Sequence, residues 1–263
     1  MKQILRDKVS VIIIAHNEAG NIARCLESIR RQTLKPDEVI LVAHNCTDNM
    51  VEIAKKILKQ VQDDGIKTKL VELSGPEGIV FARVRGFEEA SHEYIACIDG
   101  DSYALKSWLW RLISRLHRRK NVAVGGGVWL TGGLIPSLMS LDFFWLKPIY
   151  IPFIRFWSRF APQNDESDDG WNGNYFWGAN FAVRKSVYEK VGGLIPFIQL
   201  NQKLGLSLAP EDLYLAKKVS EVGRVEIEPW AVVVSKATKT NWKIRTKLQG
   251  QDRKKLINYL NRS

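Results

Sequence analysis

The stretch that decides the fold is Val9–Glu18, which reads VSVIIIAHNE. Its first seven residues are apolar or small and rich in valine and isoleucine, which favour β-strands. Polar turn residues follow directly, in His16, Asn17 and Glu18. A β-rich run that ends in such a turn predicts a strand over Val9–Ala15.

Similar runs recur along the first half of the chain, with helical patterns between them. The predicted strands are Val9–Ala15, Glu38–Ala43, Lys69–Leu73, Tyr94–Asp99 and Val122–Val128. Apolar residues at helical spacing are Ile22, Leu26 and Ile29, followed by Val51, Ala54 and Ile57. This alternation predicts an α/β fold with a doubly wound, mostly parallel sheet. Ligands of such sheets bind beyond the carboxyl ends of the strands, so Ala15–Glu18, Ala43–Asp48 and Asp99–Asp101 are expected to line one crevice.

The length and the composition of the chain limit the number of domains and the kinds of site that it can form. The chain has 263 residues, of which 45% are hydrophobic, enough for one large domain or one domain with an insertion. The three cysteines, Cys25, Cys46 and Cys97, are too few and too widely spaced for a disulfide framework or a thiolate metal site, so a reducing cytoplasm is expected. The segment Met1–Lys8 and the apolar run after it lack the pattern of a signal peptide.

The net charge of +11 favours an anionic partner: nucleic acid, an anionic membrane surface or a phosphorylated ligand. Basic residues concentrate at 111–120 and along 236–255, where a solvated helix face is an equally good explanation. No nucleic-acid-binding motif accompanies them, so no nucleic acid is expected as a partner. The glycine-rich motifs of dinucleotide-binding proteins and nucleoside triphosphatases are also missing.

The sheet pattern ends after Val128. Residues 134–160 are rich in Leu, Ile, Phe, Trp and Pro with interspersed Lys and Arg, as in an interfacial helical element on a membrane, although packing against the domain or a second subunit explains them equally well. Asn164–Asn174 is acidic and polar and is expected to form a loop or lid. Residues 236–263 are predicted to form a basic amphipathic helix, whose apolar face could meet a membrane or the domain.

Two carboxylates, Asp99 and Asp101, follow the apolar run Tyr94–Ile98 at the carboxyl end of a predicted strand. Gly100 between them is small enough for a ligand to approach closely. Oxygen ligands of this kind suit Mn²⁺ or Mg²⁺ that bridges phosphates, because these ions keep open positions for substrate oxygens. Alone, the pair could equally be a turn with solvated aspartates.

Four segments together resemble family 2 glycosyltransferases, which have the GT-A fold. They are Val9–Glu18, Val42–Asp48 (VAHNCTD), Ala82–Asp101 and Trp177–Asp212. Their order and spacing match the family from Val9 to about Gly223. The resemblance implies a GT-A domain over 1–235, with a nucleotide-binding part at 9–128 and an acceptor-side part at 163–235, before the basic tail at 236–263.

On the donor side, the resemblance assigns Ala15, Asn17 and Glu18 to the first nucleotide-binding turn. It places Asp99 near the ribose and makes Asp101 the ligand of a Mn²⁺ or Mg²⁺ cofactor.

On the acceptor side, Trp177, Gly178 and Asn180 match the segment that lines the acceptor. Glu211 and Asp212 match a Glu-Asp motif whose aspartate is the catalytic base in inverting members. The alternative is a carboxylate pair that only complements the dipole of a helix beginning after Pro210.

The sequence departs from the family pattern at two places. His44, beside Asn45, stands where the family has an aspartate that hydrogen-bonds the pyrimidine base, and a neutral imidazole offers one donor and one acceptor there. In Ala82–Gly86 the family's asparagine is Val84. Arg83 or Arg85 could still reach the diphosphate, or be a surface arginine.

The expected function is therefore that of an inverting enzyme that moves a sugar from a nucleotide diphosphate sugar to a saccharide or lipid-linked acceptor. Residues 249–253 lack the Gln-x-x-Arg-Trp motif of processive members, so a single addition is expected. The expected location is cytoplasmic, peripheral on the inner face of the membrane. The rivals are a nucleotidyltransferase, which would normally carry a glycine-rich basic loop near its first strand, and a non-catalytic protein that binds nucleotide sugars.

Overall fold

The computed structural model describes residues 7–118, 120–131, 176–206, 210–236 and 242–261. Eight strands form one sheet in the order β3-β2-β1-β4-β7-β6-β8-β5. The strands are β1 (Val9–Ala15), β2 (Glu38–His44), β3 (Lys67–Leu73), β4 (Tyr94–Asp99), β5 (Ser102–Ala104), β6 (Asn121–Thr131), β7 (Asn180–Arg184) and β8 (Arg224–Lys236). The helices are α1 (Ile22–Arg30), α2 (Met50–Asp63), α3 (Ile79–Glu89), α4 (Trp108–Leu116), α6 (Lys185–Lys190), α7 (Ile195–Leu204), α8 (Glu211–Ser220) and α9 (Trp242–Leu260).

The predicted α/β fold with a mostly parallel sheet is confirmed. Strands β3, β2, β1 and β4 run parallel, in the arrangement that crossover helices impose. Strand β7 is antiparallel to both of its neighbours, β4 and β6, while β8 is parallel to β6. The five predicted strands are all present. Three of them are longer than predicted, because β2 ends at His44, β3 begins at Lys67 and β6 extends over Asn121–Thr131.

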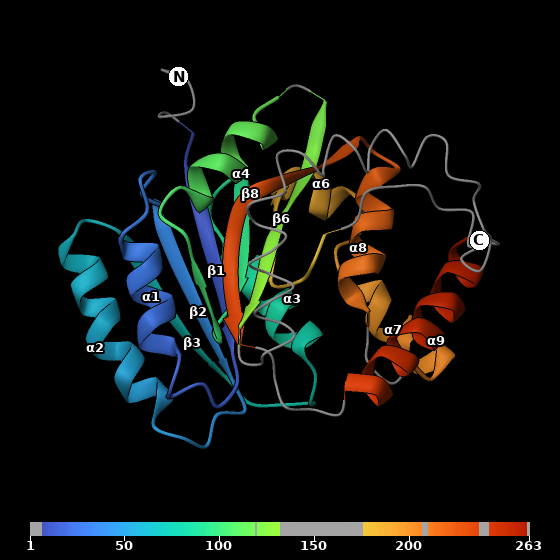
Figure 1. Cartoon of the computed structure of the whole chain (residues 1–263), viewed down its shortest axis with the longest axis horizontal. Helices are drawn as coiled ribbons and strands as arrows, with labels where there is room; N and C mark the ends of the chain where they lie inside the picture. The colour runs from blue at the N-terminus through green and yellow to red at the C-terminus, as the bar shows by residue number, and fades with distance from the viewer. Residues whose placement is uncertain (1–6, 119, 132–175, 207–209, 237–241, 262–263) are drawn as a thin grey trace.

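Helices cover both faces of the sheet, which explains why β1 is buried throughout and apolar except at Ser10 (Figure 1). Alternate side chains of a strand point to opposite faces. Val11 and Ile13 pack in the core that α1, α2 and α4 cover, whereas Ile12 and Ile14 pack in the core of α3, α7, α8 and α9. Figure 1 shows α1 and α2 on one side of the sheet and α7, α8 and α9 on the other.

The C-terminal segment is helical, as α9, and its last turns are part of the domain. Leu256 and Ile257 are buried in the same core as α7 and α8, while Lys254 and Lys255 are exposed. The Lys203 ammonium lies 5.1 Å from the centre of the Tyr259 ring, which also ties α9 to α7. The expected interfacial insertion at 134–160 and the expected lid at 164–174 lie outside the described residues.

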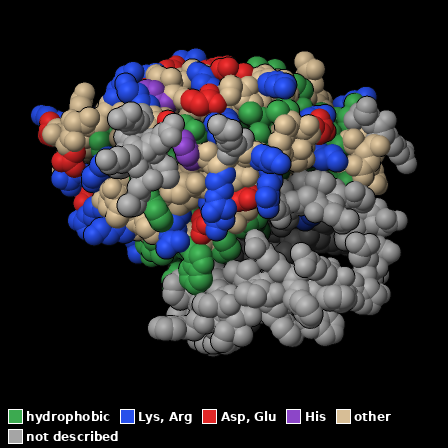
Figure 2. Space-filling model, turned by 90° about the horizontal axis from the view of Figure 1, so that it is seen from above, with side chains coloured by type: hydrophobic (Ala, Val, Ile, Leu, Met, Phe, Trp, Pro, Cys, Tyr) green, Lys and Arg blue, Asp and Glu red, His purple; other side chains and the backbone are tan. Residues whose placement is uncertain are grey.

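Lys and Arg side chains lie at several places on the face seen in Figure 2, with Asp and Glu side chains between some of them. Within the described parts of the chain, no helix is both long enough and apolar enough to span a bilayer.

Candidate active site

The carboxyl ends of β1 and β4 lie side by side, with Asp99 at the end of β4 and Asp101 in the turn that follows it. Gly100 donates its N–H to the Ile14 carbonyl at 2.7 Å. A Cβ at position 100 would lie 2.6 Å from the Ala15 Cβ, closer than carbon atoms approach. The glycine is therefore required for packing against β1, in addition to any ligand approach that the sequence suggested.

Asp101 is half-buried and faces two hydroxyl groups. Its carboxylate accepts hydrogen bonds from Ser102 at 2.9 Å and from Ser235 at 3.4 Å. Ser235 comes from β8, 134 residues further along the chain, because the antiparallel pairing of β5 with β8 sets it opposite Ser102. No local sequence pattern marks Ser235, so the sequence analysis missed it.

Arg83 lies between the two pairs of candidate carboxylates. Its side chain is 1% exposed, so it is not a surface arginine. The guanidinium forms an ion pair with Glu211 and donates to Asp99 Oδ1 at 3.3 Å and to the Gly178 carbonyl at 3.1 Å. Burial opposes its ionisation, but Glu211 and Asp99 outweigh that and raise the pKa of Arg83.

The carboxylates around Arg83 have raised pKa values. Burial raises the pKa of Asp99 to about 6, with Arg83 opposing and Asp101 and Asp212 adding to the rise. Burial likewise raises the pKa of Glu211 to about 7, although Arg83 lowers it. Clusters of buried ionisable groups with perturbed pKa values are typical of functional sites.

Asp212 lies in the first turn of α8, next to Glu211, and is half-buried. Its Oδ2 accepts the Gly178 N–H at 3.0 Å, and its Oδ1 accepts the Leu213 N–H at 2.8 Å. The second bond is the kind that a helix N-terminus offers. The first joins α8 to the turn before β7, so Asp212 is held from two directions.

The first turn, Ala15–Glu18, is tied to the second turn by Asn17. The Asn17 side-chain oxygen accepts the N–H groups of Thr47 at 2.7 Å and Asp48 at 3.2 Å. Asn17 has φ 53°, in the left-handed region that costs a non-glycine residue energy and recurs at functional sites. Burial raises the pKa of the neighbouring Glu18, and Asp101 adds to the rise.

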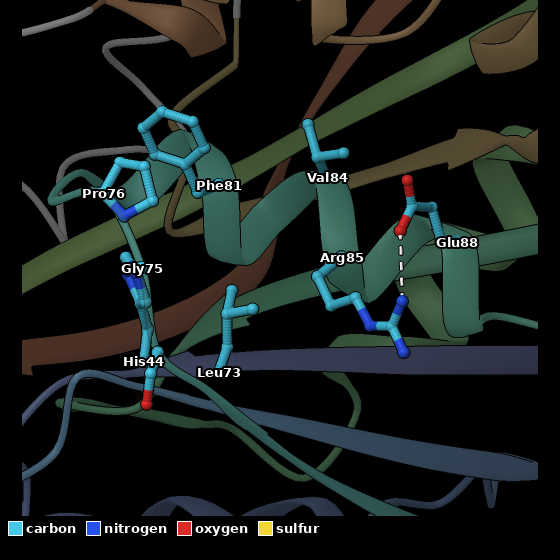
Figure 3. A pocket seen from close by; sticks show the side chains of 9 residues that line it. His44, Leu73, Gly75, Pro76, Phe81, Val84, Arg85 and Glu88 are labelled. Carbon is cyan, nitrogen blue, oxygen red and sulfur yellow. Dashed lines mark ion pairs between the residues drawn. The ribbon is translucent and has the colours of Figure 1, made fainter.

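His44 ends β2 and lines a pocket of about 180 Å³ (Figure 3). The pocket is walled by β2 and β3 on one side and by α3 on the other. It is lined by His44, Leu73, Ser74, Gly75, Pro76, Phe81, Val84, Arg85 and Glu88. His44 is 5% exposed, and its Nε2 has no hydrogen-bond partner among the described residues. Burial, together with the charge of His16, lowers the pKa of His44, which favours the neutral imidazole.

Asn45 shapes the rim of this pocket. Its side chain donates to the Gly75 carbonyl at 3.0 Å and accepts the Gly75 N–H at 3.1 Å. It also has a positive φ, of 49°. The reciprocal pair holds the loop after β3 against the end of β2.

The acceptor-side residues divide into two groups. Trp177 is 52% exposed, which leaves its ring open to a ligand. Asn180 is fully buried, and its amide bonds the Trp108 indole at 2.7 Å and the carbonyls of Gly127 and Ala231 at 2.8 Å. The structure therefore does not bring the Asn180 side chain into the crevice; it joins α4, β6 and β8 instead.

The oxygen donors around Asp101 fit a hard divalent ion. One carboxylate with neighbouring hydroxyls is a usual protein contribution to a Mg²⁺ or Mn²⁺ that a substrate phosphate also holds. Among the residues the structure describes, no group of three or more His, Cys, Asp or Glu side chains is arranged to hold a metal. An ion at Asp101 would therefore depend on phosphate oxygens from the ligand.

This fold, with aspartates at the end of β4 facing a Glu-Asp pair on α8, is that of a GT-A type glycosyltransferase. The chain belongs to glycosyl transferase family 2, whose model matches residues 10–192.

Relatives and solved structures agree with this assignment. Glycosyltransferase AglE of Haloferax volcanii is 34% identical over 125 residues, which are 47% of this chain and 40% of that protein. The glucosyl-dolichyl phosphate glucuronosyltransferase of the same organism is 26% identical over 71% of this chain and 55% of its own length. The fold is similar to that of the mannosyltransferase PcManGT from Pyrobaculum calidifontis, solved with GDP-Man and Mn²⁺, with a TM-score of 0.66 and 19% identity over 97% of this chain and 64% of that one. The chain thus spans only part of the length of these proteins.

Proposed function

We propose that the protein is an inverting glycosyltransferase that moves a sugar from a nucleotide diphosphate donor to an acceptor hydroxyl or phosphate. The observation that carries the proposal is the convergence of Asp99, two residues before Asp101, with Glu211 and Asp212 through Arg83 and the Gly178 peptide. In this proposal residues 9–128 bind the donor and residues 163–235 bind the acceptor.

The donor side supplies charge compensation. Asp101 would hold Mn²⁺ or Mg²⁺, and the chemistry that such an ion supplies when bound is neutralisation of the diphosphate leaving group. Ser102 and Ser235 fix the orientation of the Asp101 carboxylate. The joined turns at Asn17 and Asp48 shape the crevice beside it.

The acceptor side supplies a base. Attack by the acceptor oxygen on the anomeric carbon breaks the bond to the diphosphate oxygen and inverts that carbon. The proton of an acceptor hydroxyl goes to Asp212, which the Gly178 N–H orients. Trp177, exposed next to this turn, offers an aromatic face to the sugar.

The pocket beside His44 is proposed to take the nucleobase. Its walls of Leu73, Phe81 and Val84 suit a flat ring, and the unpartnered His44 Nε2 offers one polar contact. In the neutral imidazole this nitrogen is either a donor or an acceptor, according to the tautomer. A panel of nucleoside diphosphates, ranked by affinity for wild type and His44→Ala, tests this assignment. Equal losses for every nucleotide would mean that His44 does not read the base.

The acceptor is proposed to be lipid-linked and the enzyme to work as a peripheral protein on the inner face of the membrane. The 26% identical glucuronosyltransferase, named for a dolichyl phosphate substrate, supports the first part. The basic tail at 236–263 supports the second, through attraction to anionic lipids. A single sugar is added per encounter, in keeping with the missing Gln-x-x-Arg-Trp motif.

Replacement of Asp212 by Asn tests the catalytic role. The change keeps the size and removes the basicity, so turnover should fall about 100-fold or more while nucleotide affinity stays within about threefold. Glu211→Gln should cost less turnover. If Asp212 serves only the helix terminus, Asp212→Asn would lose about 1 kcal/mol of stability or less and keep its turnover.

The products separate the rival functions. Incubation of the wild type with UDP-glucose or GDP-mannose and Mn²⁺ should release the nucleoside diphosphate. A nucleotidyltransferase would instead release pyrophosphate from a nucleoside triphosphate and a sugar phosphate. A binding protein would take up the donor and release nothing.

A further inference from the structure

Arg83 is the only described side chain that contacts both Glu211 on the acceptor side and Asp99 on the donor side. It projects from α3, which belongs to neither pair. The Asp99 end of β4, the turn at Gly178 and the first turn of α8 meet at its guanidinium. A Cβ at Gly178 would lie 2.7 Å from Arg83 Nη1, so any side chain there would have to displace the Arg83 guanidinium.

This arrangement is a costly way to stabilise a fold. Burying Arg83 and Glu211, with Asp99 half-buried beside them, costs desolvation energy that an apolar cluster would avoid. Within the described residues, the Arg83 Nε has no hydrogen-bond partner, which adds to that cost. Because such an ion group contributes little to the stability of a fold, we expect a functional reason for it.

The explanation lies in how Arg83 reaches Asp212. The Gly178 peptide accepts a hydrogen bond from Arg83 through its carbonyl and donates one to Asp212 Oδ2 through its N–H. Glu211, the ion-pair partner of Arg83, is the residue next to Asp212 on α8. Two independent routes therefore connect the guanidinium to the position of Asp212.

We infer that Arg83 is a positioning residue, which sets the distance between the donor carboxylates of β4 and Asp212 and does not bind the diphosphate. This inference rests on the proposed function. The two roles predict opposite kinetic effects. A diphosphate ligand contributes to donor affinity, whereas a positioning residue contributes to turnover, since a displacement of about 1 Å in a reacting group can cost about 100-fold.

The test compares Arg83→Lys, Arg83→Met and the double variant Arg83→Met/Glu211→Gln with the wild type. Turnover is nucleoside diphosphate release from UDP-glucose or GDP-mannose, and affinity is calorimetric binding of UDP or GDP, all with Mn²⁺. For Arg83→Met we expect turnover to fall about 100-fold with affinity within about threefold. Arg83→Lys keeps the charge and should recover about tenfold of that loss.

Folding is controlled in two ways. Arg83→Met alone could unfold at the assay temperature, because it leaves the Glu211 carboxylate unpaired. The double variant removes this carboxylate and should therefore restore the melting temperature but not the turnover. Arg115→Met is the matched control, because Arg115 also pairs with a buried carboxylate, Glu228, on a different part of the sheet. It should leave both turnover and affinity unchanged.

Three results would overturn the inference: wild-type turnover in Arg83→Met, a loss of UDP and GDP affinity of tenfold or more that accounts for the whole effect, or an equal loss of turnover in Arg115→Met. None of these bears on the proposed function, which fails separately if the wild type releases no nucleoside diphosphate.

Discussion

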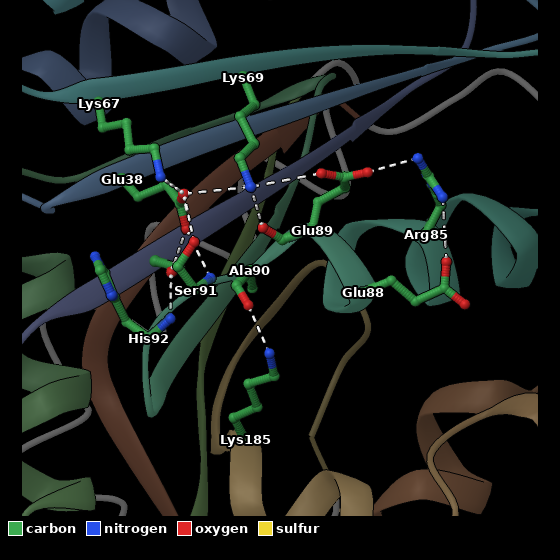
Figure 4. A network of polar contacts seen from close by, with 11 residues as sticks. Glu38, Lys67, Lys69, Arg85, Glu88, Glu89, Ala90, Ser91, His92 and Lys185 are labelled. Atoms are coloured by element: carbon green, nitrogen blue, oxygen red, sulfur yellow. Dashed lines mark hydrogen bonds and ion pairs between the residues drawn. The ribbon is translucent and has the colours of Figure 1, made fainter.

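Two buried glutamates in this protein have pKa values shifted in opposite directions, and their surroundings explain the difference. Glu38 is at the start of β2, and burial works to raise its pKa. Hydrogen bonds from the Ser91 N–H and the hydroxyls of Ser10 and Ser91, together with Lys67, lower it to about 2 (Figure 4). Glu211 has one guanidinium as its ion partner, and its pKa rises to about 7. The hydrogen bonds to Glu38 stabilise its ionised form, as expected of a group with a structural role. The raised pKa of Glu211 is typical of a functional site.

Glu38→Gln should weaken the fold in a pH-dependent way. The folded pKa of Glu38 lies below its ordinary value of 4.5, so its ionised form contributes stability above pH 4.5 that is lost as the pH falls through about 2. The shift corresponds to at most about 3 kcal/mol. Denaturant melts of the variant should show that loss near neutral pH and a flatter acid limb between pH 4.5 and 2. Glu189→Gln, exposed on α6, is the control and should change stability by less than about 0.5 kcal/mol.

Asp101→Ala should remove the metal dependence of nucleotide binding. Without an ion, the diphosphate faces Asp99, Asp101 and Glu18 with like charge, so wild-type affinity for UDP or GDP should rise about tenfold or more with Mn²⁺. In the variant, the thermal shift given by either nucleotide should be the same in Mn²⁺ and in EDTA. Asp63→Ala, exposed on α2, should behave as wild type. Equal wild-type affinity in Mn²⁺ and EDTA would contradict the assignment of Asp101.

The sequence predicted Asp99, Asp101, Glu211 and Asp212 as site residues, because short local motifs that resemble those of the family carry them. It did not predict that Arg83 connects these pairs. That connection depends on three segments meeting in space, and only the packed structure fixes their distance. The burial of Asn180 was missed for the same reason, since its three partners lie on elements far apart in sequence.

At the scale of elements, the predicted strands β1, β2 and β4 are buried along nearly their whole length, and their mostly apolar runs mark them in the sequence. The predicted strand β3 differs, because it lies at the edge of the sheet and is half-exposed. Strands β5, β7 and β8 were not predicted. β5 has only three residues, and β8 mixes Glu226 and Glu228 with apolar residues around Pro229. The β6–β8 register shifts between Gly126 and Gly127. This shift depends on pairing with a strand that is distant in sequence, so no local sequence pattern predicts it.

Leu256→Ala should show that α9 is part of the domain. Leu256 is fully buried in the core that α7 and α8 share, so its truncation should cost about 2 to 5 kcal/mol in denaturant unfolding. Asn258→Ala, exposed on the same helix, should cost about 0.5 kcal/mol or less. A helix that detaches freely would make the two variants indistinguishable.

For the whole molecule, the excess of positive charge affects which partners the protein attracts more than it affects the fold. The net charge is +11, and residues 236–263 contain nine Lys and Arg against one Asp. Because Leu256 and Ile257 are used by the core, these apolar side chains of α9 are not available to a lipid layer in the folded domain. Any attraction between α9 and a membrane would therefore come chiefly from charge, through exposed residues such as Lys254 and Lys255.

Flotation with liposomes should reveal this attraction. Each Lys near an anionic surface adds roughly 1 kcal/mol, so the double variant Lys254→Ala/Lys255→Ala should bind anionic vesicles about 30-fold more weakly than wild type. Raising the salt shortens the Debye length from about 10 Å at 0.1 M to about 3 Å at 1 M and should release the protein. Vesicles of zwitterionic lipid are the control and should bind little. Binding that survives 1 M salt would assign the contact to apolar residues such as those at 134–160, and a protein that stays at the bottom of the gradient at low salt would remove the membrane from the proposed function.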